Sequence, residues 1–186
     1  MKAAPGCEVY GYDFSVNSVC VPIGIKSIAS NGSPHQFGPE IELESDLKRR
    51  SHFYPFALGP KDAFSLIDDP KMYTLRTLME RNGHGFIDVL KIDIEGNEFE
   101  SLEVFIDSFH GEPLPFGQLQ LEVHVFGHSE WQDFPKLLRW WEKLEAAGLR
   151  PFFSESNLVY SNLLRGVRPE LIEVCLTVYL MIMGQG

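Results

Sequence analysis

Two different spacings of hydrophobic residues along the chain predict its secondary structure. From Leu119 to Val125 every second residue is apolar, which is typical of a strand with one covered face. Residues 87–92 are apolar except at Asp88 and Lys91, and this pattern favours a central strand covered on both faces. We expect further strands in four segments, at residues 7–12, 52–59, 151–153 and 172–180.

Apolar residues at helical spacing predict three helices between these strands. The first covers residues 74–82, and the second follows Gly96 with apolar residues from Phe99 to Phe109. The third begins near Asp133, a good N-cap residue, and ends at Gly148. We expect its buried face to consist of Phe134, Leu137, Leu138, Trp141 and Leu144.

The alternation of strands and helices predicts an α/β fold with a largely parallel sheet. We expect one domain over residues 6–180. Residues 16–44 are rich in Gly, Pro, Ser and Asn and fit no regular element. We therefore interpret them as an atypical loop or insertion.

The charge and cysteine content of the chain argue against several classes of binding partner and site. The formal net charge is −10 and the longest basic run is Lys48-Arg49-Arg50, which argues against nucleic acid or an anionic membrane as the main partner. Three scattered cysteines predict neither a disulfide framework nor a zinc knuckle. No signal-peptide-like or membrane-spanning apolar run is seen, so we expect a soluble chain with the cytoplasm as its default location.

Polar residues at the ends of the predicted strands are the candidates for chemistry, because ligands of parallel α/β sheets bind outside the carboxyl ends of the strands. Asp13 follows the first strand, where a carboxylate either accepts hydrogen bonds from both ribose hydroxyls or caps a turn. Glu122 and His124 lie near the end of another strand. They fit a base with its orienting partner, two metal ligands or a structural hydrogen-bonded pair.

Asp93 and Glu95 form a second candidate pair, directly after the strand at residues 87–92. Two close carboxylates shift each other's pKa unless a cation or a substrate relieves their repulsion, which favours a functional site. The alternative is an acidic first turn that complements the dipole of the following helix. That alternative explains Glu98 well and Asp93 less well.

The segment from Ile87 to Glu98, with the sequence IDVLKIDIEGNE, closely resembles the motif after strand four of the FkbM-like methyltransferases. It is closer still to related methyltransferase-like domain proteins that are common in fungi and animals. Weaker similarities follow in the expected order, namely CEVYGYD at residues 7–13, residues 52–59, LQLEVH at residues 119–124 and the helix that carries Trp140 and Trp141.

This resemblance implies a Rossmann-like, three-layer sandwich with a mostly parallel sheet. It also implies transfer of a methyl group from S-adenosylmethionine, usually to an oxygen of a small-molecule or sugar-type acceptor. Carried over by position, the cofactor-binding residues would be Asp13, Phe14, Ala57, Leu58 and Asp93. The catalytic residues would be Glu95, Glu122 and His124, with His124 or a carboxylate as the general base.

The resemblance further allows a divalent metal held by Asp93, Glu95 and Glu122. Because strand one and the glycine-rich loop of the family should precede Gly6, the resemblance also predicts that the chain lacks them. It further implies that residues 174–186 form an atypical tail. We therefore expect a truncated domain that is inactive in isolation. The alternative functions are a non-catalytic remnant or binding module with a Rossmann-like fold and, further away, a carboxylate-based metal hydrolase.

Overall fold

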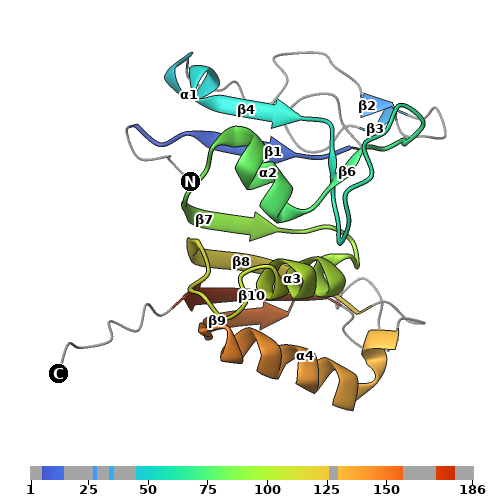
Figure 1. Cartoon of the computed structure of the whole chain (residues 1–186), viewed down its shortest axis with the longest axis vertical. Coiled ribbons are helices and arrows are strands. Elements are labelled where there is room, and N and C mark those ends of the chain that lie inside the picture. Colours follow the sequence, from blue (N-terminus) through green and yellow to red (C-terminus); the bar gives the residue numbers. More distant parts are fainter. Residues whose placement is uncertain are drawn as a thin grey trace. The chain divides into compact units, whose positions relative to one another are not determined.

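The structure is a computed structural model that describes residues 6–14, 27–28, 34–35, 45–125, 130–156 and 171–178. The chain divides into two compact units. The first comprises Met1–Leu58 with Asp62–Tyr73, and the second comprises Gly59–Lys61 with Thr74–Gly186. Strands and helices are mixed along the chain, so the prediction of an α/β fold is confirmed (Figure 1).

The first unit contains a parallel pair of strands, β1 (Val9–Tyr12) and β4 (Ser51–Tyr54). Aromatic rings stack across this pair, and the rings of Tyr10 and His52 lie 4.5 Å apart between centroids. The imidazole of His52 also lies 2.8 Å from the carboxylate of Glu8. Side-chain pairs of this kind across neighbouring strands are what stabilises a small sheet.

Four shorter strands and a helix complete the described part of the first unit. They are β2 (Ser27–Ile28), β3 (Pro34–His35), α1 (Ser45–Arg49), β5 (Ala57–Leu58) and β6 (Met72–Tyr73). Strands β2 and β3 pair antiparallel, whereas β5 and β6 pair parallel.

One prediction for this unit is revised, and another is covered only in part by the described residues. The single strand expected at residues 52–59 is two strands, β4 and β5, because Pro55 interrupts the segment. The loop expected at residues 16–44 contains the two-residue strands β2 and β3, and its other residues lie outside the described part of the chain.

A four-stranded sheet organises the second unit. Its strands β7 (Ile87–Ile92), β8 (Phe116–His124), β10 (Leu171–Val178) and β9 (Leu149–Ser156) lie in that spatial order. Strands β7 and β8 are parallel, and the helix α3 (Glu98–Asp107) connects them in a β–α–β arrangement. The carboxyl ends of β7 and β8 consequently lie at the same edge of the sheet.

Strand β10 runs antiparallel to both of its neighbours, so the sheet of the second unit is only partly parallel. The expected coverage of β7 on both faces is also wrong for the described residues. Strand β7 lies at the edge of this sheet, and 51% of the surface of Val89 is exposed. Alternating burial along β8 is confirmed, with Leu119, Leu121 and Val123 buried.

Helices α2 (Leu75–Asn82) and α4 (Phe134–Ala146) begin at capping residues that the sequence carries. The side chains of Thr74 and Asp133 accept hydrogen bonds from backbone N–H groups of the first turns of α2 and α4. Helix α3 contacts β8 and α4, and α4 contacts β9 (Figure 1). Among the described residues, no helix has the length and apolar character that crossing a membrane requires.

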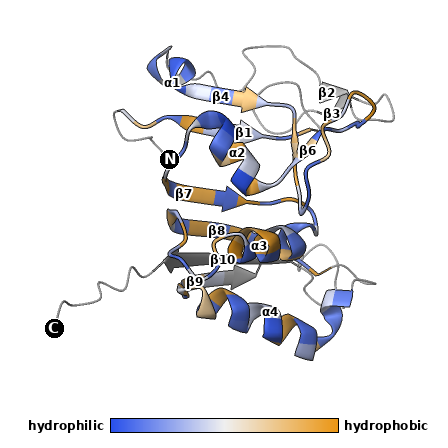
Figure 2. Ribbon diagram, viewed as in Figure 1, coloured by the Kyte–Doolittle hydropathy of each residue, from blue (hydrophilic) through white to orange (hydrophobic). Residues whose placement is uncertain are grey.

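The core of the second unit lies between this sheet and the helices α3 and α4. Hydrophobic residues are concentrated along β7, β8 and α3 (Figure 2). Phe99 is fully buried, stacks on Trp131 at 4.2 Å between ring centroids and accepts a hydrogen bond at its carbonyl oxygen from the indole N–H of Trp140.

The predicted buried face of α4 is partly wrong. Trp140 and Leu144 are buried and four residues apart, whereas Phe134 and Leu138 are exposed. The covered face is rotated from the predicted one because Trp140, rather than Trp141, reaches the backbone of α3.

Truncation of buried Leu121 tests this assignment of the core. We expect Leu121→Ala to lower the free energy of unfolding by about 2–5 kcal/mol, because it removes buried methyl groups and leaves a cavity. The same substitution at exposed Leu138 should change it by about 0.5 kcal/mol or less. Urea unfolding followed by tryptophan fluorescence measures both values, and equal values would contradict the assignment.

Candidate active site

The connection between β7 and α3 has an unusual backbone conformation. Glu95 has a φ of 54° and Gly96 has a φ of 101°, so two consecutive residues lie in the left-handed region. Glycine adopts this conformation readily, whereas for a residue with a side chain it costs about 1–2 kcal/mol. Strained backbone conformations of this kind are concentrated at functional sites. The turn directs the backbone N–H groups of Ile94 and Gly96 toward the start of α3.

The carboxylate of Glu98 accepts these N–H groups. It lies 3.0 Å from the nitrogen of Ile94 and 2.9 Å from that of Gly96, and the residue is fully buried. The third partner is Nδ1 of His124, at 2.7 Å. Burial by itself would raise the pKa of Glu98, but the hydrogen bonds from His124 and the backbone outweigh it and lower this pKa.

Glu98 is therefore an ionised acceptor, and Nδ1 of His124 is the donor in their hydrogen bond. His124 lies at the end of β8 and is only 3% exposed. Burial by itself would lower the pKa of His124. The hydrogen bond to Glu98 and the negative charges of Glu98, Glu95 and Asp93 outweigh burial and raise this pKa.

The other ring nitrogen of His124, Nε2, lies near two further carboxylates. It is 3.7 Å from Oδ1 of Asp93 and 3.6 Å from Oε2 of Glu95. One ligand atom from each of these three residues lies within 4.8 Å of the other two. The side chains of Asp93 and Glu95 are 38% and 77% exposed, so the cluster is open to solvent on one side.

This arrangement places one oriented imidazole and two accessible carboxylates at the carboxyl ends of two adjacent parallel strands. That edge is where α/β sheets bind ligands. The three side chains can accept the proton of a hydroxyl group, hydrogen-bond a polyhydroxylated molecule or bind a cation. We refer to Asp93, Glu95 and His124 as the edge cluster.

A comparison with protein-family models decides the family. The model described as Methyltransferase FkbM domain matches residues 26–151, more than half of the chain. The chain belongs to this family. The matched segment contains β7, α3 and β8, and therefore the whole edge cluster of the FkbM domain. No match was found among the curated proteins or among the solved structures.

The structure brings together only some of the predicted site residues of the FkbM domain. Asp93, Glu95 and His124 meet in the edge cluster, whereas Glu122 is not one of its three members. Glu122 is half-buried on β8 and is paired in register with Glu173 of β10. Its predicted catalytic role stays a prediction.

The other predicted residues belong to the first unit. Asp13 is exposed directly after β1, and its N–H donates to the carbonyl oxygen of Tyr54. Phe14 is exposed as well, whereas Ala57 is buried in β5 and is followed there by half-buried Leu58. Asp13 thus lies at the carboxyl end of a strand that pairs parallel with β4, as the sequence predicted.

Sequence reasoning missed the role of Glu98. It interpreted this residue as part of an acidic first turn, where a carboxylate complements the helix dipole in water. In the structure the side chain is turned inward and holds His124 instead. The signal that could have found it is topological, because a helix between two adjacent parallel strands begins beside the end of the second strand.

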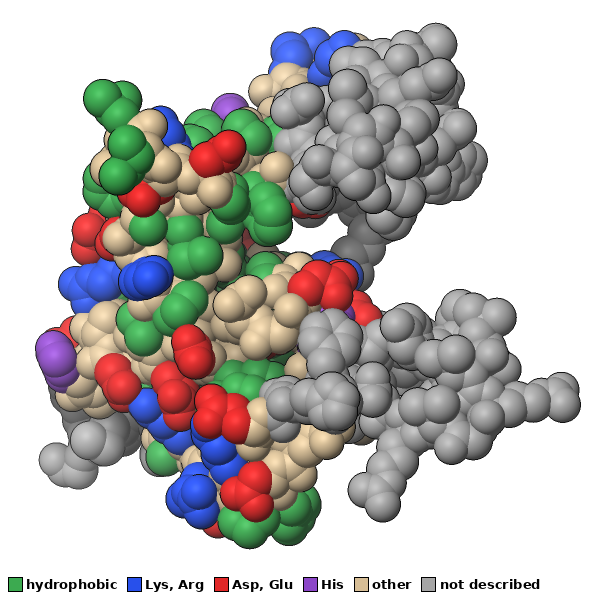
Figure 3. Space-filling view, turned by 90° about the vertical axis from the view of Figure 1, so that its right-hand side faces the viewer, with side chains coloured by type: hydrophobic (Ala, Val, Ile, Leu, Met, Phe, Trp, Pro, Cys, Tyr) green, Lys and Arg blue, Asp and Glu red, His purple; other side chains and the backbone are tan. Residues whose placement is uncertain are grey.

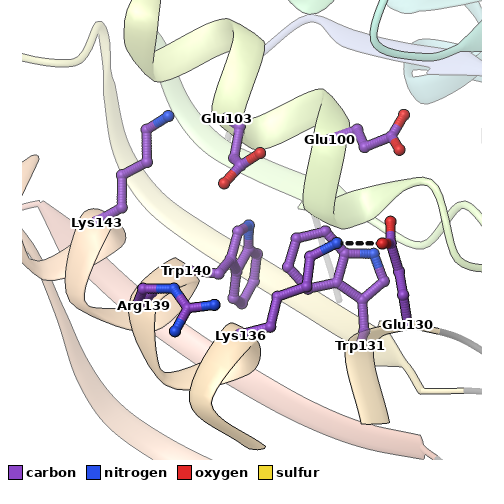
Figure 4. A pocket seen from close by; sticks show the side chains of 8 residues that line it. All are labelled: Glu100, Glu103, Glu130, Trp131, Lys136, Arg139, Trp140 and Lys143. Carbon is purple, nitrogen blue, oxygen red and sulfur yellow. Dashed lines mark ion pairs between the residues drawn. The ribbon is translucent and has the colours of Figure 1, made fainter. Parts of the chain in front are cut away.

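A surface groove of about 400 Å³ lies beside α3 and α4 of the FkbM domain. Both positively and negatively charged side chains line the groove. Acidic and basic side chains are interspersed around α4 on the face shown in Figure 3. Lys136 forms an ion pair with Glu130 at 2.6 Å and lies over the ring of Trp131 (Figure 4). Lys143 forms an ion pair with Asp107. Because these cations are already paired with the protein's own groups, the groove is a weaker candidate than the edge cluster.

The Glu98–His124 pair predicts a pH dependence of stability. The lowered pKa of Glu98 gives stability that is complete above its ordinary value of 4.5 and lost as the pH falls through the lowered value. The raised pKa of His124 gives stability that is complete below its ordinary value of 6.5 and lost as the pH rises through the raised value. Both contributions are complete only between these two ordinary values.

We therefore expect Glu98→Gln to lower the free energy of unfolding most between pH 4.5 and 6.5, and less on either side. Urea unfolding across this range measures the difference from the wild type. Glu100→Gln, at an exposed position on the same helix, is the matched control and should show no such maximum. A difference for Glu98→Gln that is constant with pH would contradict an ionised pair.

Proposed function

We propose that this FkbM domain is an S-adenosylmethionine-dependent methyltransferase that acts on an oxygen of a small-molecule or sugar-type acceptor. The observation that carries the proposal is the edge cluster at the carboxyl ends of β7 and β8, within the segment that matches the family. In this proposal the acceptor binds at the cluster, and its hydroxyl group is directed toward the cofactor's methyl group.

The fold supports the proposal through the connection of its strands. Strands β7 and β8 are adjacent and parallel with α3 between them, which is the repeating unit of Rossmann-like sheets. We propose that the four strands of the second unit are part of such a sheet. Sheets of this kind bind ligands at the edge where Asp93 and His124 lie.

Methyl transfer to an oxygen requires few protein side chains. The acceptor oxygen forms a bond to the methyl carbon, the bond between that carbon and the sulfonium sulfur breaks, and the acceptor's proton leaves. Positioning of the two reactants and removal of this proton are the steps that a protein can assist. In our proposal Glu95 and His124 lie on the acceptor's side of the site, and Glu98 keeps the imidazole in place.

For the first unit, we propose the cofactor-binding residues that the resemblance implies. Asp13 is exposed at the carboxyl end of β1, and its carboxylate is suited to the two ribose hydroxyls of S-adenosylmethionine. Phe14, Ala57 and Leu58 are proposed to contact the adenosine part.

Titration calorimetry with S-adenosylhomocysteine, the product of the cofactor, tests the proposal. We expect binding, and we expect Asp13→Asn to weaken it about 10- to 100-fold, because hydrogen bonds to a charged group contribute about 1.5–3 kcal/mol. Asp88→Asn removes the same charge from an exposed position on β7 and should leave the affinity unchanged. Transfer of labelled methyl groups to a panel of hydroxyl acceptors then identifies the acceptor class.

The same titration is repeated on the chain extended by any sequence encoded upstream. It distinguishes a chain that needs a further segment to bind the ligand from a domain that does not bind it at all. Binding by either protein, lost in its Asp13→Asn variant, supports the proposal. If neither protein binds the ligand, the proposal is wrong and the domain is better described as a non-catalytic binding module.

A further inference from the structure

The geometry points to a divalent-cation site formed by Asp93, Glu95 and His124. We infer that the edge cluster acts on the acceptor through this cation. The inference about the acceptor rests on the proposed function, whereas the cation site itself rests on the three side chains alone.

The distances in the edge cluster fit metal ligands better than they fit direct hydrogen bonds. Nε2 of His124 lies 3.7 Å from Oδ1 of Asp93 and 3.6 Å from Oε2 of Glu95, beyond the usual N–H···O range of about 2.7–3.2 Å. Ligands bound at about 2.1 Å to one tetrahedral ion are about 3.4 Å apart. The two separations from His124 are close to that value, and the third, between Asp93 and Glu95, is within 4.8 Å. One ion can therefore contact all three side chains after a movement of the exposed carboxylates.

The orientation of His124 is a second, independent observation. Metal-binding histidines typically donate the N–H of one ring nitrogen to a carboxylate and bind the metal with the other nitrogen. Glu98 occupies the position of that carboxylate, because its Oε1 lies 2.7 Å from Nδ1. Glu98 is fully buried and His124 nearly so, which fixes the ring with Nε2 toward Asp93 and Glu95.

The ligand types indicate the class of cation. One imidazole with two carboxylates suits Mn²⁺, Fe²⁺ or Zn²⁺ better than Ca²⁺, which is bound by oxygen ligands. Three protein ligands leave at least one coordination position, on the solvent-exposed side of Asp93 and Glu95. A hydroxyl oxygen of the acceptor bound at that position would lose its proton to water more readily, as metal-bound water does.

This ligand set differs from the one that the family resemblance allowed. The resemblance allowed Glu122 as a ligand beside Asp93 and Glu95, whereas the structure places His124 there. The difference has a chemical consequence, because an imidazole nitrogen shifts the preference away from Mg²⁺ and toward transition metals.

Direct binding of Mn²⁺ and Zn²⁺ to the metal-free chain tests the inference without any cofactor or acceptor. Titration calorimetry measures both ions, and the loss of the free Mn²⁺ signal in electron paramagnetic resonance gives the stoichiometry. We expect one ion to bind per chain. The double variant Asp93→Asn/Glu95→Gln should lose binding, and because both positions are exposed it should keep the fold.

Two further variants make the result specific. Asp88→Asn/Glu142→Gln removes the same two charges from exposed positions outside the edge cluster and should bind the ions as the wild type does. Glu98→Gln should weaken binding about 10- to 100-fold, as expected when the partner of a metal-binding histidine is changed.

Failure of the wild type to bind either ion would overturn the inference, as would equal binding by the wild type and the Asp93→Asn/Glu95→Gln variant. Such a failure leaves the proposed function intact if S-adenosylhomocysteine still binds. Conversely, if one ion binds at the edge cluster while neither the chain nor its extended form binds S-adenosylhomocysteine, the cation site is supported and the methyltransferase proposal is contradicted.

Discussion

A buried hydrogen bond between Glu98 and His124 is the constraint on which the candidate site depends. Burying a carboxylate and an imidazole is costly unless each is paired and hydrogen-bonded. The costs are offset here because Glu98 accepts hydrogen bonds from two backbone N–H groups and from the imidazole. The hydrogen bond fixes the ring of His124, and a fixed ring gives its second nitrogen a constant direction.

The neighbouring elements position Glu98 for this hydrogen bond. The left-handed turn at Glu95 and Gly96 brings the backbone to Glu98, and it also holds the carboxylate of Glu95 near His124. Phe99, the next residue of α3, is fully buried against Trp131 and anchors the start of the helix in the core. Hydrophobic packing thus sets the position of Glu98, and Glu98 sets the position of His124.

Much of the fold could be predicted from the sequence, because most of its signals are local. The capping residues Thr74 and Asp133 and the alternation along β8 carry information about their own segments, and the corresponding elements are confirmed. The rotation of α4 toward Trp140 could not be predicted, since both Trp140 and Trp141 fit helical spacing. The choice between them depends on the contact with α3, which is distant in sequence.

The candidate site, too, could be predicted where the signal is local and not where it depends on contacts distant in sequence. The sequence singled out Asp93, Glu95, Glu122 and His124 because they lie at or near the ends of strands, and the structure brings Asp93, Glu95 and His124 together. It gave no reason to separate Glu98 from an ordinary acidic first turn, because the burial of Glu98 depends on where β8 ends. Membership in the FkbM family supports a methyltransferase, whereas the roles of individual side chains follow from the distances between them.

The central claim is that Glu98 holds Nδ1 of His124 and thereby directs Nε2 to Asp93 and Glu95. Nitrogen-15 NMR of the imidazole, at a pH where His124 is neutral, tests it most directly. We expect a proton on Nδ1 that exchanges slowly with water in the wild type and rapidly in Glu98→Gln, with an unprotonated Nε2. A neutral ring protonated at Nε2, or equal exchange in the two proteins, would contradict the account.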